Sequence, residues 1–65
     1  MKVREVIARI EADGWYPVRT RGDHRQYKHP TKRGKVTVSG HPGDDVAAGT
    51  LANIWRQAQI PRGER

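Results

Sequence analysis

Two stripes of apolar residues, one near each end of the chain, constrain the fold more than any other feature of the sequence. The first stripe is Val3, Val6, Ile7 and Ile10. The second is Leu51, Ile54, Trp55 and Ala58. Both follow the i, i+3, i+4, i+7 spacing that gives a helix one apolar face. We therefore expect two helices, the first ended by Gly14 and the second opening near Gly49 and stopped before Pro61.

The residues between the two stripes alternate with a period of two, which is typical of strands. We expect strands over residues 17–20, 24–29 and 35–39. A tight turn at 21–23 and a loop at 30–34, rich in Gly and Pro, separate them. The predicted order is helix, three antiparallel strands, helix. Because each element has one apolar side, the simplest packing is an α+β two-layer sandwich with both helices on one face of the sheet.

The size of the chain limits its organisation. With 65 residues, it is expected to form a single domain over 1–60, followed by a frayed tail at 61–65. It has no cysteine, so disulfides and thiolate metal sites are excluded. No apolar run approaches the length of a signal peptide or a membrane span, and we expect a soluble cytoplasmic protein.

The charge of the chain favours an anionic partner. Thirteen Lys and Arg stand against seven Asp and Glu, and the isoelectric point is about 10.6. Arginine supplies most of the positive charge, and its guanidinium pairs with phosphate in a fork geometry. This balance favours nucleic-acid binding. An acidic protein partner would account for the charge equally well.

Alternation along the second and third strands assigns their side chains to two faces. Tyr27 is the largest apolar group in its strand, so its face is expected to join the core together with Val36 and Val38. Arg25 and His29 share that side. The opposite, open face is then polar throughout, with the residues His24, Gln26, Lys28, Lys35, Thr37 and Ser39.

His24 is the one titratable base on this open face, at the start of a strand and just after Gly22. Imidazole titrates near neutral pH and can take or give a proton in the cell. A strand histidine is nevertheless more often an ordinary surface residue than a catalyst. The three histidines show no metal-ligand spacing, so we expect neither a metal site nor a cofactor. Trp15 and Trp55 are expected in the core.

Two segments also carry a resemblance to a known family. The first contains Gly14-Trp15, Arg19 and the run Gly-Asp-His-Arg-Gln-Tyr at 22–27. The second contains His41-Pro42-Gly43 and the helical segment 49–60, which opens with Gly-Thr-Leu. In this order and spacing the chain resembles the HicA family of bacterial toxins, small messenger-RNA interferases of type II toxin–antitoxin modules. The resemblance extends from the first helix to Ile60.

This resemblance implies a fold like the double-stranded RNA-binding domain and ribosome-independent cleavage of messenger RNA, with His24 as the catalytic residue. With a histidine as the base, no divalent metal would be needed. It also implies a HicB-type antitoxin that covers this histidine, with the toxin a monomer alone or a hetero-oligomer with the antitoxin. The chain departs from the family pattern at four positions. Asp23 stands where serine is usual, Asp44 for a basic residue, Trp55 for leucine and Gln59 for glycine.

The first hypothesis is therefore an endoribonuclease in which His24 acts as general base on a ribose 2′-hydroxyl. The candidate RNA-binding residues are Arg19, Arg21, Arg25, Gln26, Lys28 and Lys35. No second residue for protonating the leaving oxygen stands out in the sequence. Two rival hypotheses are an RNA-binding module that does not cut and a protein-interaction module whose basic face binds an acidic antitoxin.

Overall fold

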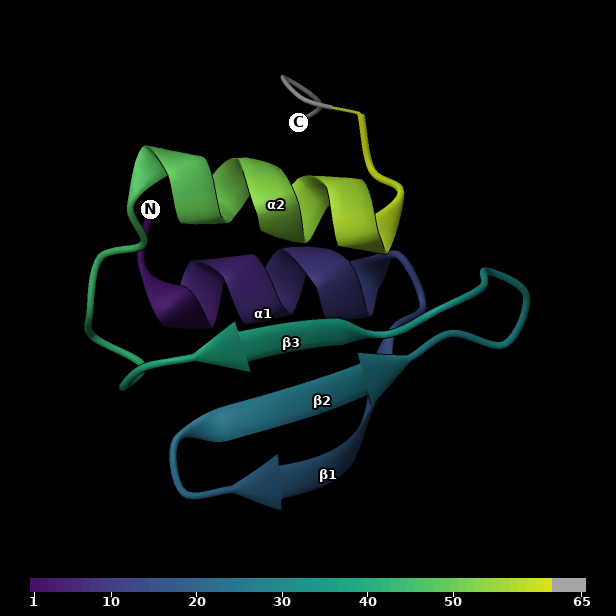
Figure 1. Ribbon diagram of the computed structural model, residues 1–65, viewed down its shortest axis with the longest axis horizontal. Coiled ribbons are helices and arrows are strands. Elements are labelled where there is room, and N and C mark those ends of the chain that lie inside the picture. The colour runs from purple at the N-terminus through teal and green to yellow at the C-terminus, as the bar shows by residue number, and fades with distance from the viewer. Residues whose placement is uncertain (62–65) are drawn as a thin grey trace.

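The computed structural model describes residues 1–61 and contains two helices and three strands (Figure 1). In chain order they are α1 (Val3–Ala12), β1 (Tyr16–Arg21), β2 (His24–Lys28), β3 (Val36–Ser39) and α2 (Ala48–Ala58). The predicted order and α+β class are confirmed. Apart from Pro61, the predicted frayed tail lies outside the described residues. Neither helix is long and apolar enough to cross a membrane in this part of the chain.

The element ends differ from the prediction by one or two residues. β1 is longer at both ends, and α2 begins one residue early, at Ala48. β2 ends before His29, whose ring instead accepts hydrogen bonds from the backbone of the following loop. β3 begins at Val36 rather than Lys35. Contacts of side chains and loops determine where strand pairing stops, and the alternation of residues in the sequence does not reveal these contacts.

The sheet is antiparallel with the strand order β1-β2-β3. The β1–β2 hairpin closes on the pair Arg21 and His24, so its loop is only two residues long. Gly22 opens that loop at a φ of 60°, a backbone conformation that glycine adopts without a Cβ penalty. Further along, the register shifts between Pro17 and Arg19, which leaves Val18 as the extra residue of a β-bulge.

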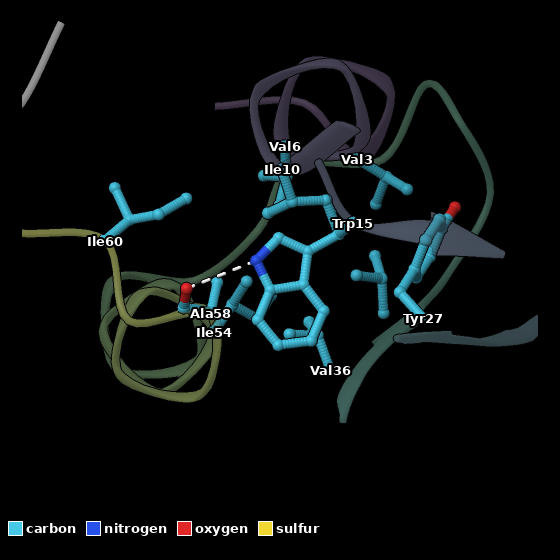
Figure 2. Packing of buried hydrophobic residues seen from close by; sticks show 10 residues of the cluster. Val3, Val6, Ile10, Trp15, Tyr27, Val36, Ile54, Ala58 and Ile60 are labelled. Carbon is cyan, nitrogen blue, oxygen red and sulfur yellow. Dashed lines mark hydrogen bonds between the residues drawn. The ribbon is translucent and has the colours of Figure 1, made fainter. Parts of the chain in front are cut away.

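One hydrophobic core lies between the helices and a single face of the sheet (Figure 2). The predicted core face of the strands is confirmed, since Tyr27, Val36 and Val38 are buried. The helices and their C-terminal extensions supply the rest: Val3, Val6, Ile10, Trp15, Ile54, Ala58 and Ile60. Trp15 is buried as predicted, whereas Trp55 is half-buried and packs against the edge of this cluster.

The end of α1 delivers Trp15 into the core. The Gly14 N–H bonds to the Glu11 carbonyl at 3.0 Å, and the Trp15 N–H bonds to the Ile10 carbonyl at 3.1 Å. This pair of bonds is a Schellman motif, which requires a left-handed residue at Gly14, where φ is 110°. A Cβ at Gly14 would also lie 2.8 Å from the His29 ring. The predicted end of α1 therefore requires glycine for two reasons, the left-handed backbone and the close approach of the His29 ring.

β1 extends beyond the part of the sheet that the helices cover. All six of its residues are exposed, whereas β2 and β3 each contribute to the core. Figure 1 shows the helices on the β3 side of the molecule and β1 farthest from them. The β1–β2 hairpin therefore presents its open face, and the whole of β1, to the surroundings.

Candidate functional site

A hollow of about 360 Å³ lies on the open face of the β1–β2 hairpin, lined by Arg19, Arg21, His24 and Gln26. The strand register explains why these four meet. Arg21 pairs with His24, and Arg19 pairs with Gln26 on the next rung. Directly opposed residues of an antiparallel pair point to the same face. The structure thus brings together four of the seven residues predicted for the site.

His24 supplies the imidazole of this hollow. Its side chain is 63% exposed, and the Nε2 atom lies 3.5 Å from the Oδ1 atom of Asp23. It is the first residue of β2, so its backbone is held by pairing with Arg21 on one side and Ser39 on the other. A rigid ladder therefore fixes the Cα of an imidazole whose ring is open to a ligand.

Two guanidinium groups accompany this imidazole. Arg19 and Arg21 are both exposed and lie two residues apart in β1, which places their side chains on the same face about 7 Å apart along the strand. Guanidinium groups bind phosphate oxygens through paired hydrogen bonds. Gln26 adds an amide that can both donate and accept. The arrangement can hold a phosphodiester beside a proton acceptor.

Three of the predicted residues do not lie in the hollow. Arg25 is on the helix side of β2, where its Nη1 atom donates to the carbonyls of Gly40 at 2.8 Å and Asp23 at 3.4 Å. Lys28 is on the open face but about 13 Å along β2 from His24, at about 3.3 Å per residue. Lys35 is exposed in the loop before β3. Arg25 instead ties the loop after β3 to the β1–β2 turn.

His29 and His41 lie in different surroundings from His24. The Nδ1 atom of His29 accepts hydrogen bonds from the backbone N–H groups of Thr31 and Lys32, both at 3.1 Å. Its Nε2 atom therefore carries the proton and donates to the Asp13 carbonyl at 2.7 Å. His41 is exposed in the loop before α2. Within residues 1–61, no group of three or more His, Asp or Glu side chains could hold a metal ion.

A lysine and an aspartate join His29 at the end of α1. The Lys32 ammonium lies 2.6 Å from the Asp13 Oδ2 atom and also donates to the carbonyls of Gln59 and Ala58. The hydrogen bond from Lys32 holds the pKa of the Asp13 carboxyl below its usual value. These contacts join loop 30–34 to the C-terminal ends of both helices, away from the hollow.

The sequence prediction missed one residue of the open face. Tyr16 pairs with Lys28 and therefore points to the same side as Gln26 and His24. The prediction began this strand at Pro17 and left Tyr16 outside it. Continuing the strand back to Trp15, which the helix end already fixes, would have brought Tyr16 into consideration.

Comparison with known proteins agrees with the motifs in this chain. The model of the family described as the HicA toxin of bacterial toxin–antitoxin systems matches residues 3–60. The matched range begins with α1 and includes every strand, the hollow and α2. A search among curated proteins gives no match.

Proposed function

Because the chain belongs to the HicA toxin family of bacterial toxin–antitoxin modules, we propose that it is an endoribonuclease that cleaves messenger RNA in the cytoplasm, with His24 as the catalytic base. One observation carries this proposal. An exposed imidazole, two arginines and a glutamine line one hollow on a rigid hairpin. A phosphodiester and its neighbouring 2′-hydroxyl are the groups that such a set can bind and activate.

The proposed reaction is an attack within the RNA strand. His24 removes the proton of a ribose 2′-hydroxyl, and the 2′ oxygen forms a bond to the adjacent phosphorus. The bond from phosphorus to the 5′ oxygen of the next nucleotide breaks, and that oxygen takes a proton from a water molecule in the exposed hollow. The hydroxide left behind takes the proton held by His24, which restores the base. The products are a 2′,3′-cyclic phosphate and a 5′-hydroxyl. Arg19 and Arg21 hold the phosphate oxygens while negative charge develops on them.

The proposal includes a HicB-type antitoxin as the protein that blocks the site. The open face carries the hollow and lies away from the helices, so one partner can cover His24 and both arginines together. The chain has a formal net charge of +6, and an acidic partner surface would complement it. The alternative is a module that binds RNA without cutting it, using the same arginines.

The test is RNA cleavage by the purified protein in EDTA, with wild type beside His24→Ala. A general base contributes roughly 10²- to 10⁴-fold, so the variant should lose that much rate. His41→Ala is the matched control, because it removes another exposed histidine outside the hollow. The cleaved RNA should carry a cyclic phosphate.

Two results would contradict the proposal. A His24→Ala variant that cuts as fast as wild type removes His24 from the mechanism. A wild type that binds RNA with a steep salt dependence but leaves it intact supports the binding module instead.

A further inference from the structure

β1 exposes two large apolar side chains in an otherwise polar surface. Tyr16 is 45% exposed and Val18 is 47% exposed. Tyr16 lies on the open face, paired with Lys28, whereas Val18 is the extra residue of the bulge. Core packing does not account for Tyr16, because its ring is not part of the hydrophobic cluster. The exposure of the Tyr16 ring is therefore better explained by binding to a ligand than by a role in stabilising the fold.

Tyr16 is in line with the hollow. The open face of the hairpin has three rungs beginning at the turn: Arg21 with His24, Arg19 with Gln26, and Tyr16 with Lys28. Lys28 lies four residues from His24, which corresponds to about 13 Å of strand. A ligand that occupies both ends must therefore be longer than the group bound at His24, and it passes a cation on every rung.

The edge of β1 is poorly suited to a protein strand. Pro17 lacks the N–H that a strand added to this edge would need, and the bulge at Val18 interrupts the regular spacing of the neighbouring groups. Strand addition depends on a regular row of backbone donors and acceptors. We therefore expect a ligand to bind to the side-chain face of the hairpin and not to the edge of β1.

An aromatic ring among cations matches unpaired RNA. Single-stranded nucleic acid binds where basic side chains follow the backbone and aromatic rings stack on the bases. In a duplex the bases are stacked on one another and unavailable to such a ring. Resting on the proposed function, we propose that Tyr16 stacks on an unpaired base of the RNA whose phosphate lies at His24. Lys28 neutralises a phosphate of the same strand, and the protein prefers single-stranded over duplex RNA.

The experiment compares kcat/KM on three substrates: a dinucleotide, a single-stranded oligoribonucleotide and the same oligoribonucleotide annealed to its complement. Tyr16→Ala should lower the value on the single strand about tenfold, the typical effect of losing one stacked base. It should leave the dinucleotide unchanged, because a dinucleotide does not reach Tyr16. Tyr16→Phe, which keeps the ring, should behave as wild type. Val18→Ala is the matched control, since it removes a similarly exposed side chain from the same strand.

Several results would overturn the inference. One is a Tyr16→Ala variant that cuts the single strand as wild type does, and another is a wild type that cuts duplex equally well. Equal losses on the dinucleotide and the oligoribonucleotide would mean that Tyr16 supports the hollow itself. Loss of antitoxin binding with unchanged cleavage would assign the ring to the protein partner.

Failure of the proposed function would be separately visible. In that case wild type cuts none of the three substrates. Tyr16 is then tested by equilibrium binding of the labelled single strand, which Tyr16→Ala should weaken by a similar factor. Unchanged binding would overturn the inference even for a protein that does not cut.

Discussion

Two histidines, His24 at the start of β2 and His29 just after its end, lie in very different surroundings. His24 opens the strand with its side chain 63% exposed, next to two arginines. His29 follows the strand with its side chain 9% exposed and both ring nitrogens hydrogen-bonded. They are five residues apart, so in an alternating strand they point to opposite faces. The His24 ring is open to a ligand, whereas the His29 ring makes hydrogen bonds that stabilise the fold.

The surroundings of His29 form a closing cluster, which we define as Asp13, Trp15, His29, Lys32 and the carbonyls of Ala58 and Gln59. The rings of Trp15 and His29 meet edge to face, with centroids 5.2 Å apart. The Trp15 Nε1 atom donates to the Ala58 carbonyl at 3.2 Å (Figure 2). Lys32 places its charge at the C-terminal end of α2, where the helix dipole favours a cation. Stability should therefore depend on this cluster, and activity on the hollow.

The largest effect on stability should come from exchanging His29 for alanine, with the same exchange at His24 as the comparison. His29→Ala removes the hydrogen bonds of both ring nitrogens and the contact with the Trp15 ring, which together should cost about 2–3 kcal/mol of unfolding free energy. His24→Ala removes an exposed side chain and should change it by less than about 0.5 kcal/mol. Urea denaturation of both variants measures the difference. Equal losses would break the contrast between the two histidines.

A smaller effect is expected at Asp13, and it should depend on pH. The hydrogen bond from Lys32 lowers the pKa of Asp13 in the folded protein. The ion pair therefore stabilises the fold above the unfolded pKa of 3.8 and loses that contribution as pH falls through the folded value. Because both side chains are partly exposed, we expect Asp13→Asn to cost only about 0.5–1 kcal/mol at neutral pH.

The measurement at Asp13 is urea denaturation at neutral pH and again well below pH 3.8. The deficit of Asp13→Asn against wild type should shrink in acid, where wild type has lost its own ion pair. Glu11→Gln is the matched control, because Glu11 is an exposed carboxylate in the same turn of α1. A deficit of Asp13→Asn that stays constant with pH would remove the ion pair from the account of the closing cluster.

The sequence was sufficient to predict much of this fold. The stripes from Val3 to Ile10 and from Leu51 to Ala58 predict both helices, since a period of 3.6 with one apolar face leaves little choice. Gly14 predicts the end of α1, because glycine readily adopts the left-handed conformation that ends a helix. Alternation around Tyr27 predicts which side of β2 meets the core. Each of these inferences uses neighbours within a few positions of the chain.

The rest depends on contacts between distant segments. Arg25 was predicted among the RNA-binding residues, but its guanidinium reaches the carbonyl of Gly40, fifteen residues away. The hydrogen bond of His29 to Asp13 spans sixteen residues. The pairing of Arg19 with Gln26 and of Arg21 with His24 needs the register of the hairpin, and that register includes a bulge at Val18. The family motif pointed to His24, but only the register showed which cations share its hollow.

The smallest effect is expected at Gln59, where the closing cluster meets the end of α2. Gln59 has a φ of 58°, the left-handed conformation in which a side chain costs about 1 kcal/mol relative to glycine. Its Nε2 atom donates to the Arg33 carbonyl at 2.9 Å, an exposed bond of about 0.5 kcal/mol that offsets part of this cost. Gln59→Gly relieves the backbone and loses the bond, so it should stabilise the fold by only about 0.5 kcal/mol. Gln59→Ala loses the bond and keeps the strain, so it should destabilise the fold by about that amount.

Thermal unfolding of the Gln59→Gly and Gln59→Ala variants side by side isolates the contribution of the backbone strain. Variants of equal stability would mean that the left-handed conformation of Gln59 carries no strain relative to glycine.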